Sequence, residues 1–172
     1  MSFDSICAYD HLVPHYKDDT EKNIFECFTL LSSLAAIRQK VKIGQIVVCN
    51  SYRNPALLAK MLSTLDITSN GRSELGIGAG WYEKYEFPPA RTRIMQLDES
   101  ISIIKAMWTE KCASFEGEYY KIKNAKCNPK PIQKPRPLIM VGGSGEKSIL
   151  NILLTALWSE HLKRYCKALE NI

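Results

Sequence analysis

The stretch VKIGQIVVC, residues 41–49, is a mostly β-branched and apolar run, typical of a strand buried on both faces. Upstream of it, residues 24–38 place apolar side chains at helical spacing. Downstream, Asn54 and Pro55 open a second helix, because Asn is a good N-cap and Pro fits the first helical turn. We therefore predict one strand between two helices.

The rest of the chain repeats this alternation. Three further strands are predicted, at residues 5–9 (SICAY), 73–77 (SELGI) and 138–141 (LIMV). The clearest helix spans residues 90–108, an irregular proline-bearing segment spans 115–137, and a helical end begins at residue 146. Such an order predicts parallel pairing through right-handed crossovers. Periodicity leaves two architectures open, an open α/β sheet and half of a barrel.

Length and composition indicate one domain over residues 1–172. Of these 172 residues 45% are hydrophobic, which is enough for one sizeable core. A closed (β/α)8 barrel usually needs roughly 250 residues, so the chain is short for that architecture. The net charge of +5 comes from basic residues that are scattered, apart from those at 121–136. A nucleic-acid binder would show a clustered basic face with interleaved aromatics, so we expect no nucleic-acid partner.

The cysteines and the apolar stretches both favour a soluble cytoplasmic protein. Six cysteines occur without any C-x-x-C pair and mostly beside apolar neighbours. We therefore expect buried free thiols in a reducing compartment, and no metal site. The start of the chain has no basic region followed by an apolar run. Its apolar stretches are far below the ~20 residues that span a bilayer, so we expect no membrane partner.

Four short segments follow directly on the predicted strands, where ligands bind in parallel α/β folds. They are Asp10-His11 and residues 49–53, 78–82 and 142–145. The last, GGSG, offers backbone N–H groups that suit a phosphate, or it is a plain strand-to-helix turn. The glycines at 78 and 80 let a ring or a backbone approach closely.

The polar side chains of these segments allow two interpretations each. His11 acts as a proton donor or hydrogen-bonds a carbonyl, since histidine titrates near neutrality, or Asp10 caps a helix beside a loop histidine. Cys49 is a redox thiol or a packed side chain. Tyr52 and Arg53 face a ring and an anion, or they only precede the next helix.

Seven blocks, in their order along the chain, resemble the luciferase-like flavin-dependent oxidoreductases. They are residues 50–60 (NSYRNPALLAK), 75–82 (LGIGAGWY), 87–91 (FPPAR), 108–110 (WTE), 115–120 (FEGEYY), 128–131 (NPKP) and 141–147 (VGGSGEK). The resemblance extends over residues 3–150, and a divergent helical tail follows at 151–172. Within the family the chain is most similar to the branch linked to coenzyme F-420, a deazaflavin.

The resemblance implies a (β/α)8 barrel that holds F-420 or FMN at its C-terminal face and acts on an unknown small molecule. It also implies a bulge with a non-proline cis peptide in the family's third strand, here around Gln45, Ile46 and Val47, against which the ring lies. The reaction is hydride transfer or, with reduced FMN, oxygen activation. The implied cofactor-binding residues are Gln45, Ile46, Val47, Asn50, Gly78, Gly80, Gly142, Gly143 and Ser144, and the implied catalytic residues are His11 and Asp10.

The chain also departs from the family pattern. Family members carry a strand and helix before the segment at residue 3, and later strands after residue 150. The stretch after Trp81 is shorter than in the family. We therefore expect a partial (β/α)8 barrel that lacks the first and the later strands, and a homo-oligomer that covers the open sheet edges. The alternative is a truncated or degenerate, non-catalytic flavin-binding or accessory protein.

Overall fold

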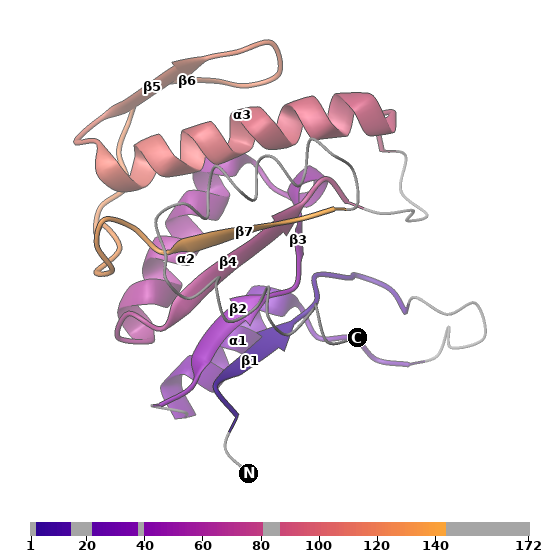
Figure 1. Cartoon of the computed structure of the whole chain (residues 1–172), viewed down its shortest axis with the longest axis vertical. Helices are drawn as coiled ribbons and strands as arrows, with labels where there is room; N and C mark the ends of the chain where they lie inside the picture. The colour runs from indigo at the N-terminus through magenta and orange to yellow at the C-terminus, as the bar shows by residue number, and fades with distance from the viewer. Residues whose placement is uncertain (1–2, 15–21, 38–39, 81–86, 144–172) are drawn as a thin grey trace, which may run out of the picture.

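The computed structural model describes residues 3–14, 22–37, 40–80 and 87–143, and within them it shows a parallel sheet with helices packed on one face (Figure 1). The predicted alternation of strands and helices is confirmed, and the helical end from residue 146 lies outside the described residues. In chain order the elements are β1 (Ser5–Ala8), α1 (Cys27–Ile37), β2 (Lys42–Gln45), β3 (Val48–Cys49), η1 (Asn50–Tyr52), α2 (Pro55–Thr68), β4 (Ser73–Gly78), α3 (Ala90–Thr109), β5 (Ala113–Glu116), β6 (Lys121–Ala125) and β7 (Leu138–Gly142).

Every pairing in the main sheet is parallel, as predicted. Strand β1 pairs with β2, both β2 and β3 pair with β4, and β4 pairs with β7. The register sets Ala8 beside Gln45, and Gly78 beside both Cys49 and Gly142. Because the strands run in the same direction, their carboxyl ends lie along one edge of the sheet.

The prediction of one continuous strand over residues 41–49 is wrong. The chain forms β2 and β3 with a break at Ile46 and Val47, whose peptide bond is cis. The N–H of Ile46 still donates to the carbonyl of Ala8 at 3.0 Å, so the break stays tied to β1. Ile46 is 57% exposed, which also corrects the expected burial on both faces. The resemblance placed this cis peptide correctly within residues 45–47.

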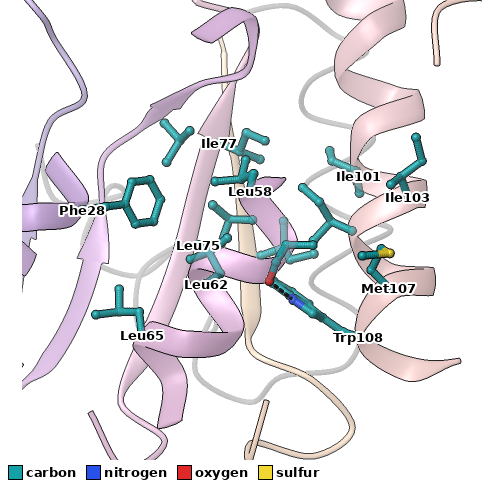
Figure 2. Packing of buried hydrophobic residues seen from close by; sticks show 14 of the residues in the cluster. Phe28, Leu58, Leu62, Leu65, Leu75, Ile77, Ile101, Ile103, Met107 and Trp108 are labelled. Atoms are coloured by element: carbon teal, nitrogen blue, oxygen red, sulfur yellow. Dashed lines mark hydrogen bonds between the residues drawn. The ribbon is translucent and has the colours of Figure 1, made fainter. Parts of the chain in front are cut away.

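The hydrophobic core fills the space between the sheet and the helices (Figure 2). Leu75 and Ile77 of β4 are fully buried and face Leu58 and Leu62 of α2. Trp108 of α3 completes this layer, and its indole N–H donates to the carbonyl of Ala59 at 3.0 Å. Burial of these side chains is the main force that holds the helices against the sheet.

Helix α2 begins as predicted and also fixes the loop that leads into β7. The side chain of Asn54 accepts from the N–H of Ala56 at 2.9 Å, and Pro55 occupies the first turn. Towards the other end of α2, the buried carboxylate of Asp66 accepts four hydrogen bonds, from β4 and from the loop before β7. These donors are Ser73 Oγ (2.9 Å), Ile132 N (2.7 Å), Gln133 N (3.1 Å) and Gln133 Nε2 (2.6 Å).

Part of the segment predicted as irregular is a β-hairpin. Strands β5 and β6 are antiparallel and lie over α3, with Phe115 paired to Ile122 (Figure 1). Glu99 of α3 holds the turn, because its carboxylate accepts from three successive backbone N–H groups, those of residues 118–120, at 2.7–3.0 Å. Periodicity misses this hairpin, since each strand carries few apolar side chains and is fixed by the helix beneath it.

The expectation of buried cysteines is confirmed in part. Cys27, Cys49 and Cys127 are buried, whereas Cys7 is exposed and Cys112 is half-buried. Cys7 is exposed because it lies on β1, an outer strand that has one described neighbour in the sheet. Burial and the nearby carboxylates of Asp10 and Glu26 raise the pKa of the Cys27 thiol to about 12.

Candidate functional site

The predicted strand-end segments meet at one edge of the sheet. Asp10 and His11 follow β1, Asn50 follows β3, and Gly80 follows β4. Gly143 follows β7, whose last residue pairs with the last residue of β4. Ser144 lies outside the described residues. The sheet therefore brings together those predicted site residues that the structure describes.

The bulge between β2 and β3 forms a surface on this edge. A Cβ placed on Gly142 would lie 2.9 Å from Val47 Cγ1, and one on Gly78 would lie 3.0 Å from Val47 Cγ2. A Cβ on Gly76 would overlap the carbonyl of Gln45. A side chain at Gly76 or Gly142 would force the bulge to shift, so Val47 packs directly against the glycines of β4 and β7. A planar ring can stack on such a surface.

Two predicted cofactor-binding residues, Gln45 and Asn50, have buried side chains. Gln45 is fully buried, two residues after Ile43 and therefore on the same, helix-facing side of β2. Asn50 is 1% exposed. Neither side-chain amide has a hydrogen-bond partner among the described residues. Burial at this depth removes both side chains from the surface, and the backbone of Gln45 shapes the bulge instead.

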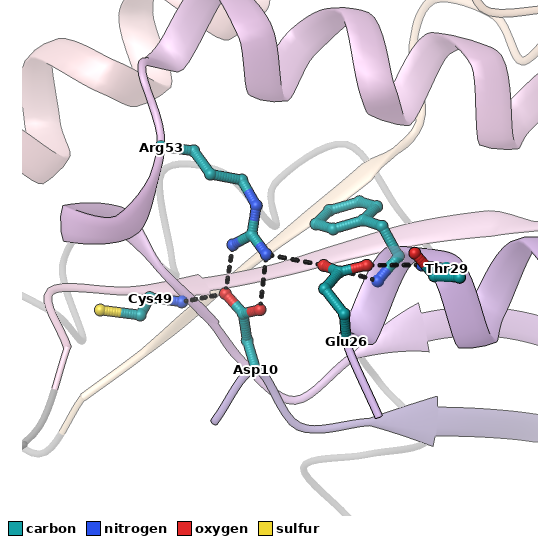
Figure 3. Close-up of polar contacts among 6 residues, drawn as sticks. Asp10, Glu26, Thr29, Cys49 and Arg53 are labelled. Atoms are coloured by element: carbon teal, nitrogen blue, oxygen red, sulfur yellow. Dashed lines mark hydrogen bonds and ion pairs between the residues drawn. The ribbon is translucent and has the colours of Figure 1, made fainter. Parts of the chain in front are cut away.

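Asp10 is the centre of a buried ionic cluster (Figure 3). Its carboxylate accepts from both terminal nitrogens of Arg53, at 2.5 and 2.9 Å, and from the N–H of Cys49 at 3.1 Å. Arg53 Nη2 also donates to Glu26 at 2.9 Å, and the guanidinium lies 5.0 Å from the centre of the Phe28 ring. The interpretation of Asp10 as a helix cap is therefore wrong. Arg53, one interpretation of which was that it faces an anion, pairs with two carboxylates of the protein itself.

Glu26 joins this cluster to the first helix. Its carboxylate accepts from the N–H groups of Phe28 (3.1 Å) and Thr29 (2.7 Å), so it caps α1. Burial alone would lower the pKa of Arg53, but the neighbouring carboxylates of Asp10 and Glu26 outweigh it and raise that pKa. The guanidinium therefore stays charged over the whole accessible pH range.

His11 lies next to this cluster in a half-buried position. Its ring meets the ring of Tyr9 edge to face, with 5.2 Å between the centres. His11 directly follows Asp10, whose carboxylate is held by Arg53 and by the N–H of Cys49. The described residues contain no group of three or more His, Cys, Asp and Glu side chains that could hold a metal ion.

Arg93 is a residue of this region that sequence reasoning missed. From α3 its Nη1 donates to the carbonyl of Gly80 at 2.5 Å, and its Nε donates to the carbonyl of Pro88 at 3.0 Å. Gly80 has a φ of +86°, and a Cβ there would lie 2.6 Å from Cys49 Sγ. Arg93 thus fixes the turn after β4. An arginine in a helix gives no sequence signal for such a role.

A groove of about 520 Å³ lies elsewhere, on the outer surface between α1 and α2. Its walls come from the two helices, and one end of it reaches Glu26 of the ionic cluster. Its lining consists of Glu26, Phe28, Thr29, Ser32, Ser33, Lys60, Met61, Thr64 and Leu65. No helix in the described part of the chain is long and apolar enough to cross a membrane.

Residues 1–151 match the family of luciferase-like monooxygenases. The chain belongs to this luciferase-like family. The F420-dependent glucose-6-phosphate dehydrogenase of Microbacterium testaceum is 33% identical over 151 residues, which are 84% of this chain and 44% of that protein. The FMNH(2)-dependent dimethylsulfone monooxygenase of Pseudomonas putida is 33% identical over 129 residues, 71% of this chain and 35% of that protein.

A solved structure confirms the fold. The luciferase-like chain superposes on an F420-dependent secondary alcohol dehydrogenase, in complex with an F420-acetone adduct, with a TM-score of 0.78 and 25% identity. The match covers 87% of this chain and 46% of that one. The chain spans less than half the length of the curated relatives named above. Its parallel strands and helices are thus part of a luciferase-like (β/α)8 barrel, as the sequence predicted.

Proposed function

We propose that this luciferase-like chain carries the cofactor-binding edge of an oxidoreductase that uses coenzyme F-420 or FMN on a small molecule. The observation that supports it most is the bulge at Ile46 and Val47. There Val47 packs against the glycines of β4 and β7, and together with the exposed Ile46 it leaves an apolar surface at the carboxyl ends of the strands. Relatives from both cofactor classes match the chain, which supports both cofactors equally.

The residues of the edge fit such a group. Val47 and the exposed Ile46 would back the ring, because an aromatic system gains contact area on a flat aliphatic surface. The backbone of Gly142 and Gly143 would hold the phosphate, as N–H groups at the end of a strand do. When bound, either cofactor supplies hydride transfer, and reduced FMN also supplies oxygen activation. His11 would hold or release a proton beside the ring.

Two matched variants test the cofactor surface. Ile46 on the bulge is 57% exposed and Leu57 on α2 is 55% exposed, so the two truncations to Ala remove similar amounts of exposed surface. We expect Ile46→Ala to weaken the binding of FMN or F-420 about fivefold, since roughly 1 kcal/mol of apolar contact is lost. Leu57→Ala should leave the affinity unchanged. Fluorescence titration with each cofactor measures both affinities.

The same titration separates catalysis from binding alone. Substrate-dependent bleaching of the bound cofactor indicates an oxidoreductase. Binding without turnover indicates a non-catalytic flavin-binding or accessory protein. A chain that binds neither cofactor contradicts the proposal in both forms.

We also propose that the chain is a cytoplasmic homo-oligomer. The support is apolar surface on the described residues, such as Phe3 (77% exposed) beside β1, and Phe25 (74%) and Ile37 (70%) at the two ends of α1. Large side chains of this kind, left exposed at the outer strand and at both ends of the helix beside it, are candidates for a contact with another chain. Sedimentation equilibrium measures the mass in solution, and a monomer over the micromolar range would contradict the oligomer.

A further inference from the structure

Two β/α units of the sheet, β1 with α1 and β3 with α2, meet in one ionic cluster. Asp10 comes from the end of β1, Glu26 from the start of α1, and Arg53 from the turn before α2. The side chain of Arg53 is only 11% exposed and that of Asp10 only 1%. A charged pair at this depth loses most of its hydration, so it persists only with full hydrogen bonding. Figure 3 shows the fork of Arg53 spanning both carboxylates.

The geometry of the cluster is stricter than charge pairing requires. Arg53 uses two nitrogens for the two oxygens of Asp10, which fixes the plane of the carboxylate as well as its position. The third bond of Asp10 comes from the N–H of Cys49, the second residue after the cis peptide bond. One carboxylate therefore joins the end of β1 to the strand segment that follows the bulge.

We propose that Arg53 is the positioning residue of the strand-end site, acting through Asp10 to set His11 and the bulge relative to each other. This inference rests on the proposed function, because it gives that site its alignment. His11 follows Asp10 directly in the chain, and Val47 precedes the tied Cys49 by two residues. Any shift of the Asp10 carboxylate therefore moves both sides of the site. In this role Arg53 acts through Asp10, whose two carboxylate oxygens it holds.

A second arginine supplies the matched control. Arg72 is also partly buried and also joins separate segments, since its side chain donates to the carbonyls of Ser69 (2.6 Å), Val41 (2.6 Å) and Ala35 (3.0 Å). It directly precedes β4, so it lies at the amino ends of the parallel strands, opposite the carboxyl ends that carry the site. Loss of either arginine should destabilise the fold, but only Arg53 should affect the site.

The test compares Arg53→Met, Arg53→Lys and Arg72→Met in the full chain. Thermal unfolding measures stability, and fluorescence titration measures the affinity for F-420 and FMN. The chain has 3 histidines, so ¹H–¹³C NMR of the imidazoles at pH 8, assigned with His11→Gln, measures the surroundings of His11 without any cofactor. The NMR measurement stands even if the wild-type chain binds neither cofactor, a result that would count against the proposed function alone.

We expect Arg53→Met to shift the His11 resonance and to weaken cofactor binding about tenfold or more, since small misplacements at a site have large effects. Arg53→Lys should change the His11 resonance and the cofactor affinity less, because lysine keeps the charge but cannot make the two parallel hydrogen bonds to Asp10. Arg72→Met should lower the melting temperature and leave the resonance unchanged. If Arg53→Met does not fold, Arg53→Lys decides. An unshifted His11 resonance in the folded Arg53 variants, or an equal shift in Arg72→Met, would overturn the inference.

Discussion

The side chain of Val47 occupies the space beside Gly142 that a larger residue would need, with 2.9 Å between Val47 Cγ1 and a Cβ placed on that glycine. Gly142 follows Val47 by nearly a hundred residues in the chain, yet the shape of the bulge depends on it. Val47 directly precedes β3 and Gly142 ends β7, and both of these strands pair with β4. The bulge and the glycines are therefore one structural unit.

Gly142→Ala should destabilise the protein by about 1–3 kcal/mol, because a well-packed site resists an added methyl group. In a Val47→Ala background most of this cost should disappear, since the side chain in contact is gone. Urea unfolding of the four proteins gives the coupling between the two sites. Gly76→Ala is the control, because its Cβ would meet the backbone carbonyl of Gln45, which Val47→Ala cannot relieve. Additive effects for Gly142 and Val47 would contradict this explanation.

Asp66→Asn should cost about 3 kcal/mol of stability. The carboxylate lies fully buried and accepts hydrogen bonds from Ser73, Ile132 and Gln133. An amide would direct its own NH2 group at one of these donors and leave a buried bond unmade. Asp98→Asn, at an exposed position of α3, should change the stability by less than about 0.5 kcal/mol. Urea unfolding compares the two variants, and equal effects would refute the role of Asp66.

Glu26→Gln should remove a pH-dependent part of the stability. Partial burial would raise the pKa of Glu26, but the N–H groups of Thr29 and Phe28 and the guanidinium of Arg53 outweigh it, so this pKa lies below its ordinary value of 4.5. A lowered folded-state pKa means that the contribution is complete above about 4.5 and disappears as the pH falls through the folded value. Melting temperatures from pH 3 to 7 should therefore differ most at neutral pH. The two curves should converge in acid.

Cys27 should resist alkylation at pH 8 in the folded protein. Its thiol is buried and its pKa is about 12, so almost no thiolate is present. Cys7 is exposed and Cys112 half-buried, and both should react first with iodoacetamide. Peptide mass spectrometry over a time course identifies the labelled positions. Labelling of Cys27 as fast as Cys7 would show that the start of α1 opens more readily than the Arg53 cluster implies.

Local patterns in the sequence were sufficient to predict most elements. The helices at α2 and α3 carry strong periodicity, and Asn54 caps α2 as its side chain suggests. The β5–β6 hairpin escaped prediction, because it depends on Glu99, a residue outside the hairpin. The single strand predicted at residues 41–49 failed for a related reason. The glycines that make room for the bulge lie on β4 and β7, so residues 41–49 themselves give no sign of it.

The sequence by itself determined the alternation of strands and helices, the parallel pairing and the family, since these follow from periodicity, crossover geometry and ordered motifs. It also placed the polar segments at the strand ends. Only the tertiary structure decided what each polar side chain does. Asp10 and Arg53 are 43 residues apart and meet in the fold, whereas Gln45 and Asn50 turn away from the surface. Side-chain roles of this kind depend on contacts between distant segments, which no local pattern encodes.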